Sequence, residues 1–173
     1  GGWAIFKKNM TIIDVGGQDT KMIKVVDGQV ADFLMNDKCA AGTGKFIEVM
    51  ATRLGADLNE MYELAAKGQP LAISAMCTVF AESEVVSLIA QNKHTDDIVH
   101  GLNKAVAAKT ASLVKRVGGE EAYMMTGGVA QNKGLVKTLE ERLGTSLVIS
   151  PKSQLCGALG AALFAYEKCT AGE

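Results

Sequence analysis

The pattern of apolar and polar positions predicts a chain that begins with strands and continues mainly with helices. TIIDVGG, from Thr11, is a buried apolar run that ends in a glycine turn, and TKMIKVV then alternates apolar and polar residues. QVADFLMN follows Asp27-Gly28, a pair typical of hairpin turns. We therefore expect three consecutive antiparallel strands at the start of the chain.

After these strands the apolar residues recur at helical spacing, at positions 46, 47, 50 and 54, until Gly55 ends the run. Asp57 is suited to be the N-cap of a short helix that follows. The remaining pattern predicts, in order, a helix at 57–66, a short strand or extended segment at 71–77, a helix at 78–92, a helix from Asp96 or Asp97 to about 117, a strand at 121–128, a helix at 132–143, a strand at 146–150 and a helix at 155–168.

The order of these elements indicates an α/β fold in one domain. Strands that alternate with helices pair in parallel through right-handed crossovers, so the whole chain predicts a mixed sheet of about five strands. The first ten residues, GGWAIFKKNM, match none of the motifs described below, and we interpret residues 1–10 as a leader or joining segment. The domain is then expected at residues 11–170, with a short tail at 171–173.

Charge and hydropathy argue against two classes of partner. The 18 Lys and Arg residues and the 19 Asp and Glu residues almost cancel, without a basic stripe, so we expect no nucleic-acid binding. No apolar run approaches the ~18 residues of a membrane span, and no signal-peptide pattern opens the chain. We therefore expect no membrane association and a cytoplasmic location.

The chain has four cysteines, at positions 39, 77, 156 and 169. They are far apart and form no CxxC pair, so a self-contained zinc site is not expected. Cytosolic thiols stay reduced, which argues against disulfides. The ordinary interpretation of each cysteine alone is a small buried apolar residue.

Three glycine turns fall at predicted strand ends or helix starts: DVGGQDT from Asp14, AGTG from Ala41 and TGGVAQN from Thr126. Glycine is common in any tight turn, but N–H groups at a turn and at a helix N-terminus also form an anion site that glycine leaves open to phosphate. Asp14 ends a predicted strand and is placed to hold a hydrated Mg²⁺. The chain has neither GxxxxGKS/T nor a GxGxxG after a strand, which excludes a P-loop and a Rossmann site.

These motifs resemble those of a known superfamily. DVGGQDTK is similar to the second phosphate motif of the acetate and sugar kinase, Hsp70 and actin superfamily, and TGGVAQN is similar to its adenosine motif. The β-β-β-α-β-α-β-α order is that of its ribonuclease-H-like, or actin-like ATPase, domain, here with extra helices inserted. IIDVGGQDTK, MNDKCAAGTGKF, CTVFAESEV and MTGGVAQN together resemble the activators (component A) of 2-hydroxyacyl-CoA dehydratases, in the BadF/BadG/BcrA/BcrD-type ATPase family, from about Thr11 to Lys168.

The resemblance implies an ATP-driven one-electron donor. In such activators a homodimer holds one 4Fe-4S cluster through two cysteines of each subunit, and ATP hydrolysis changes the shape of the dimer. A ferredoxin or flavodoxin would supply the electron, which passes to the dehydratase.

The resemblance also assigns residues. Cys39 and Cys77 are the implied cluster ligands, and Asp14 and Gln18 are the implied catalytic residues, with Asp14 holding Mg²⁺ through water. The implied ATP/ADP-binding residues are Gly16, Gly17, Gly42, Thr43, Gly44, Gly127, Gly128 and Asn132.

The surroundings of two cysteines agree with this assignment. Cys39 and Cys77 each precede a predicted helix start, where partial positive charge and unpaired N–H groups favour thiolates and an anionic cluster. A cluster of this kind needs four thiolates, so two per chain require a two-fold axis through the cluster. The alternative uses all four cysteines of one chain. Against it, Cys156 lies in a Gly/Ala-rich helix, where a small packed residue is expected, and Cys169 lies in a tail expected to fray.

The chain departs from the superfamily at its beginning. Members have two such domains with ATP between them, and the first opens with a DxGST-type phosphate loop that this sequence lacks. We therefore expect this chain to contain one wall of the ATP site and both cluster cysteines. With only one wall, tight ATP binding and fast hydrolysis by this chain alone are not expected. Two alternative functions stay open: an ATP-dependent small-molecule kinase of the same superfamily, and a non-hydrolysing module that binds a cluster and dimerises.

Overall fold

The strands form one mixed sheet in the part of the chain that the structure, a computed structural model, describes: residues 1–69, 71–74, 77–119 and 121–171. Its order is β3-β2-β1-β4-β5. β1 (Met10–Val15), β2 (Thr20–Val26) and β3 (Gln29–Asn36) are antiparallel neighbours. β4 (Tyr123–Thr126) pairs in parallel with β1, and β5 (Leu147–Ile149) pairs in parallel with β4. The mixed sheet of about five strands predicted from the sequence is confirmed.

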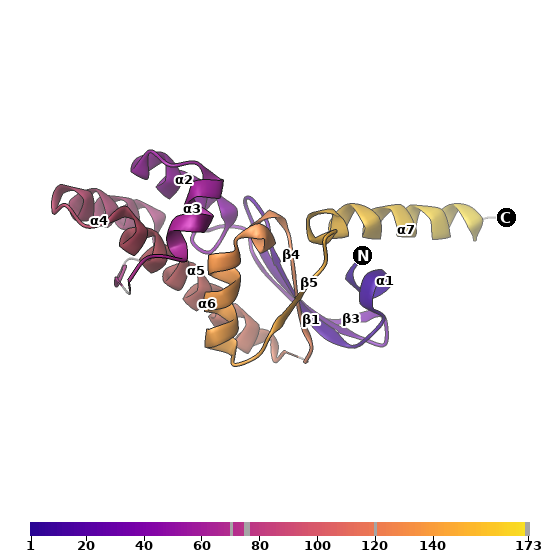
Figure 1. Cartoon of the computed structure of the whole chain (residues 1–173). Coiled ribbons are helices and arrows are strands. Elements are labelled where there is room, and N and C mark those ends of the chain that lie inside the picture. The colour runs from indigo at the N-terminus through magenta and orange to yellow at the C-terminus, as the bar shows by residue number, and fades with distance from the viewer. Residues whose placement is uncertain (70, 75–76, 120, 172–173) are drawn as a thin grey trace.

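Helices pack on both faces of this sheet (Figure 1). One layer contains α2 (Gly44–Leu54), α3 (Leu58–Ala65), α4 (Thr78–Ala90), α5 (Thr95–Val117) and α6 (Lys133–Leu143). α1 (Gly2–Phe6) and α7 (Cys156–Thr170) belong to the other face, and the short 3-10 helices η1 (Gly128–Gln131) and η2 (Ser153–Leu155) follow β4 and β5. Within the described residues, no helix is both long and apolar enough to cross a membrane.

Side chains that alternate along the strands give the sheet two apolar faces. Helices cover one of these faces more fully than the other. Ile13, Val15 and Met22 are fully buried in a large core shared with α2 to α6. The opposite face carries a smaller cluster, next to α1, of Met10, Ile12, Val25, Met124 and Cys156. α7 extends away from the sheet after Gly160, and its described residues beyond that point are exposed (Figure 1).

Local signals set the ends of α2 and α3. Gly55 ends α2 in the left-handed conformation, with φ at 66°, which glycine adopts at little cost. Asp57 begins α3: its side chain accepts from the N–H groups of Asn59 and Glu60, and the Glu60 carboxylate accepts from the Asp57 N–H. This capping box satisfies donors that a helix start would otherwise leave unpaired. Both predicted ends are confirmed.

α5 begins earlier than the sequence predicts. Its first residue is Thr95, with His94 as the N-cap, rather than Asp96 or Asp97. The two acidic residues instead occupy the first turn, where they face the positive end of the helix dipole. Of the ten residues that the sequence analysis set apart, 2–6 form α1 and Met10 is the first residue of β1.

The run at 71–77, predicted to be a short strand or an extended segment, is not a strand at 71–74, where it forms neither strand nor helix, and residues 75 and 76 lie outside the described part. Cys169 lies in the last turn of α7 rather than in a frayed tail. Of the expected tail, only Ala171 is described, and residues 172 and 173 lie outside.

Candidate functional site

Two of the three glycine turns meet where β1 and β4 end. These strands are parallel neighbours, so their carboxyl ends, at Val15 and Thr126, lie side by side. Gly127 comes so close to β1 that a Cβ atom there would lie 2.2 Å from the carbonyl oxygen of Val15, and its φ is +86°. Only glycine fits this position. TGGVAQN is thereby held against DVGGQDT.

The third turn is hydrogen-bonded to the first. The N–H of Gly44 donates to the carbonyl oxygen of Gly16 at 2.8 Å, and the N–H of Lys45 donates to that of Gly17 at 2.6 Å. These are the first N–H groups of α2, the ones that a helix N-terminus would offer to an anion. The family resemblance predicts that this loop contacts phosphate. In the structure, the first N–H groups of α2 instead bond to the β1–β2 turn.

In loop 42–44, Gly42 and Thr43 are buried and Gly44 is half-buried. Gly42 accepts a hydrogen bond from the Thr20 hydroxyl at 2.7 Å, and Thr43, which is fully buried, donates to the carbonyl oxygen of Ala40 at 2.7 Å. Gly17 and Gln18 are exposed, and a Cβ atom at Gly17 would meet nothing within 4 Å. The surface open to an anion is therefore formed by residues 17 and 18.

Asp14 lies at the same edge, with each carboxylate oxygen near a partner. Its Oδ1 accepts from the Thr126 hydroxyl at 2.6 Å, and its Oδ2 lies 3.6 Å from Nζ of Lys21. Lys21, directly opposite Asp14 on β2, also donates to Oδ1 of Asp19 at 2.5 Å. Burial by itself lowers the pKa of Lys21, but the hydrogen bond and charge of Asp19, together with the charge of Asp14, outweigh it and raise that pKa. Lys21 is therefore a stable cation between two carboxylates.

The buried side chain of Asn132 holds the TGGVAQN turn through two hydrogen bonds. Asn132 is the N-cap of α6: its side chain accepts from the N–H of Leu135 at 2.9 Å, and its amide donates to Oδ1 of Asn103 on α5 at 3.3 Å. Asn132 and Asn103 are almost fully buried. The side chain of Asn132 thus fixes the turn to α5 and α6 and faces the interior.

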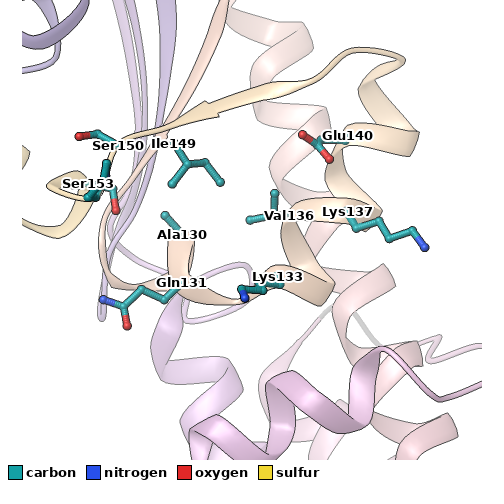
Figure 2. Close-up of a pocket in the computed structure, with 10 residues that line it drawn as sticks. Ala130, Gln131, Lys133, Val136, Lys137, Glu140, Ile149, Ser150 and Ser153 are labelled. Carbon is teal, nitrogen blue, oxygen red and sulfur yellow. The ribbon is translucent and has the colours of Figure 1, made fainter.

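A cavity of about 470 Å³ adjoins this turn, between η1, α6 and the end of β5 (Figure 2). Ala130, Val136 and Ile149 give it an apolar lining. Its polar lining residues are Gln131, Lys133, Lys137, Glu140, Ser150 and Ser153. Glu140 is held in place because its Oε1 accepts from the N–H of Leu147 at 2.8 Å. A cavity of this size with an apolar floor and a few polar groups suits a small planar ligand such as a nucleobase.

A second cavity, of about 440 Å³, lies between the sheet and α7. Asp14, Lys21 and Thr126 form its polar side. The segment that begins with Thr126 therefore lines this second cavity, and through Ala130 it also lines the first. The glycine pair of TGGVAQN lies, along the chain, between the residues that line the two cavities.

The two cysteines predicted to be cluster ligands are both exposed. Cys39 lies in the loop between β3 and α2, where the Asn36 amide donates to the carbonyl oxygens of Cys39 and Ala41 at 2.9 and 3.2 Å. Cys77 is the N-cap of α4, and its side chain makes no capping hydrogen bond. Both thiols are thus accessible, and neither is packed in the core.

A cluster site is not complete within the described part of one chain, which contains no group of three or more His, Cys, Asp or Glu side chains able to hold a metal ion. The donors present fit a cluster shared between chains. Cys77 lies at the N-terminus of α4, where the helix dipole favours a bound anionic group, and the neighbouring Thr78 hydroxyl is buried without a hydrogen-bond partner. For Mg²⁺, Asp14 offers a single partly exposed carboxylate, which fits binding through water.

Sequence reasoning missed Lys21, Asp19 and Thr126, although all three lie within the motifs DVGGQDTK and MTGGVAQN. The signal for Lys21 is the strand register: it is paired directly with Asp14, so the two side chains share one face of the sheet. Thr126 is paired with Asp14 from the other side in the same way.

Comparison with known proteins places these features in a family. The family model of the BadF/BadG/BcrA/BcrD ATPase family matches residues 1–165. The (R)-2-hydroxyglutaryl-CoA dehydratase activating ATPase of Acidaminococcus fermentans is 50% identical over 159 residues, which cover 91% of this chain and 61% of that protein.

Two solved structures are also similar. Component A of the (R)-2-hydroxyglutaryl-CoA dehydratase of Acidaminococcus fermentans has a TM-score of 0.94 and 48% identity, over 98% of this chain and 66% of that one. The activator of the 2-hydroxyisocaproyl-CoA dehydratase from Clostridium difficile, with bound ADPNP, has a TM-score of 0.90 and 44% identity, over 95% of this chain and 62% of that one. The predicted actin-like ATPase fold is confirmed, and the chain spans 61–66% of the length of these relatives.

Proposed function

The chain belongs to the BadF/BadG/BcrA/BcrD ATPase family, and from this premise we propose that it carries the nucleotide site and the cluster cysteines of an ATP-dependent activator of a 2-hydroxyacyl-CoA dehydratase. Two copies share one 4Fe-4S cluster in this function. ATP binding and hydrolysis drive the transfer of one electron to the dehydratase. A ferredoxin or flavodoxin is the proposed reductant, and the cytoplasm is the proposed location.

One pair of hydrogen bonds carries this proposal. The N–H groups of Gly44 and Lys45 hold the carbonyl oxygens of Gly16 and Gly17, so the phosphate turn is joined to the start of α2. Cys39 lies in the loop that leads into this helix start. A movement of the turn on phosphate binding therefore acts on the backbone that carries a cluster ligand, which is the coupling that an ATP-driven electron donor needs.

The nucleotide is proposed to follow the edge of the sheet. Its base occupies the cavity of Figure 2, beside Ala130 and Val136, and its phosphates cross the Gly127-Gly128 turn toward Gly17 and Gln18. The backbone N–H groups of Gly17 and Gln18, both exposed residues, are the proposed phosphate donors. Asp14 orients a hydrated Mg²⁺, and Gln18, exposed at the same turn, orients the attacking water.

The cluster is proposed to lie between two copies of the chain. It supplies the one-electron redox step when bound. Cys39 and Cys77 of each copy provide the four thiolates that such a cluster needs. Val79 and Phe80, two and three residues after Cys77, are 65% and 69% exposed. Exposed apolar residues near a ligand support a contact with a second copy at this end of α4.

Anaerobic reconstitution with iron and sulfide, followed by iron quantification and measurement of the mass in solution, tests the cluster. The expected result is a dimer with about four irons per two chains. Cys39→Ala and Cys77→Ala should each lose the iron, whereas the matched control Cys169→Ala, an exposed cysteine on α7, should keep it. Iron-free protein after reconstitution, or unchanged iron in both variants, contradicts the proposal.

Calorimetric titration with ADP and Mg²⁺ tests the nucleotide site separately. Binding supports the proposal, whereas a cluster-containing dimer that binds no nucleotide is the non-hydrolysing module expected as an alternative. Transfer of phosphate from ATP to a small alcohol or carboxylate would instead favour the kinase alternative.

A further inference from the structure

Two carboxylates border the turn at which the proposed function places phosphate groups. Asp14 is the last residue but one of β1. Asp19 lies so close to Gly16 that a Cβ atom added at Gly16 would be 3.0 Å from Oδ1 of Asp19. The two side chains are 27% and 36% exposed, so water screens their charges incompletely. Such a pair repels an arriving phosphate, which is an unusual feature for an anion site and calls for a compensating charge.

Lys21 provides that compensating charge. Its Nζ donates to Asp19 at 2.5 Å and lies 3.6 Å from Oδ2 of Asp14. Lys45, whose backbone contacts the same turn, directs its ammonium group to Glu48 at 3.2 Å instead. Lys21 is 28% exposed, and its position on β2, opposite Asp14, is set by the sheet register and not by a mobile loop.

We propose that Lys21 is a positioning residue that determines how strongly nucleotide binding depends on a divalent cation. This inference rests on the proposed nucleotide site. With Lys21 present, the group of Lys21, Asp14 and Asp19 has one net negative charge; without it, the group has two. A hydrated Mg²⁺ at Asp14 adds positive charge at the same place. Lys21 and the metal ion therefore partly replace each other in offsetting the repulsion of the phosphates.

Calorimetric titration of the chain with ADP, once with saturating Mg²⁺ and once with EDTA, tests this proposal. Lys21→Met should weaken ADP binding about tenfold in EDTA, and by less than about threefold with Mg²⁺, because the metal ion supplies the missing charge. Lys21→Arg keeps the charge and should bind ADP as the wild type does in both conditions. Lys115→Met, at an exposed position in the last turn of α5, is the control for the loss of a lysine.

A second variant separates charge from packing. Asp19→Asn combined with Lys21→Met has the same net charge at the turn as the wild type, so it should recover ADP binding in EDTA to within about threefold of the wild type. Equal weakening with and without Mg²⁺, no weakening in either condition, or no recovery in the double variant overturns the role of Lys21. A wild-type chain that binds no ADP in either condition contradicts the proposed nucleotide site itself, and the role of Lys21 with it.

Discussion

The glycine turns at the carboxyl ends of β1 and β4 and the surroundings of Cys39 and Cys77 are built in opposite ways. The turns are held to one another and to the start of α2 by backbone hydrogen bonds and by close glycine contacts. Cys39 and Cys77 are exposed, and α4 presents Val79 and Phe80 to solvent. The turns are thus fixed within one chain, whereas the cysteines and the apolar residues of α4 are open to a second molecule. A substitution at a close glycine contact should therefore act on folding, and one at the exposed apolar residues of α4 should act on assembly.

The largest expected effect is at Gly127. Gly127→Ala places a Cβ atom 2.2 Å from the carbonyl oxygen of Val15, and the backbone must shift to avoid it. The free energy of unfolding should fall by about 4 kcal/mol or more, measured by urea denaturation. Gly144→Ala is the matched control, because Gly144 also has a positive φ but a Cβ atom there would meet nothing within 4 Å.

The control should lose only about 1 kcal/mol, the cost of the strained backbone alone. Equal losses in the two variants would show that the close approach of Gly127 to Val15 does not hold the two turns together.

Thiol reactivity should separate the buried cysteine from the exposed ones. Burial raises the pKa of Cys156, and the charge of Asp14 adds to this although the N-terminus opposes it. The thiolate is the reactive form, so Cys156 forms it only at higher pH than an ordinary thiol. At pH 8, alkylation of Cys156 in the native protein should be at least about tenfold slower than that of Cys39 or Cys77, measured by mass spectrometry of iodoacetamide-treated peptides.

The alkylation rate of Cys156 should also keep rising with pH above the range in which an ordinary thiol is already fully ionised. Comparable rates at all four cysteines in the folded protein would contradict the burial of Cys156.

A smaller effect is expected on dimer assembly at Phe80. Phe80→Ser removes apolar surface from α4 next to Cys77, and should raise the dimer dissociation constant of the reconstituted protein about fivefold, measured by sedimentation equilibrium. Phe164→Ser, on α7, is the matched control because both rings are 69% exposed. If only the Phe164 variant dissociates, or if neither does, the contact between copies is not at this end of α4.

Most of the fold could be predicted from the sequence because its signals are local. Apolar spacing defined α2, Gly55 and Asp57 set the boundary between α2 and α3, and alternation with the Asp27-Gly28 turn predicted the antiparallel strands. The early start of α5 was missed because His94 and Thr95 were not recognised as the cap and first residue, and the acidic pair that follows resembled a cap.

The candidate site was less predictable because its arrangement depends on contacts between distant segments. The motifs identified three glycine turns, and the structure brings them into contact with one another. The motifs did not show that the first amides of α2 bond to Gly16 and Gly17, or that Asn132 is buried against Asn103. The role of Lys21 depends on register: a shift of one residue on β2 would move it to the other face of the sheet.

The alkylation rate of Cys39 in cluster-free protein, measured with and without saturating ADP and Mg²⁺, shows whether the phosphate turn and the Cys39 loop move together. Coupled movement should change this rate by about fivefold or more, a typical strength for coupled sites, and should leave the rate at Cys169 unchanged. An unchanged rate at Cys39 in protein that calorimetry shows to be saturated with nucleotide would mean that the two segments do not move together.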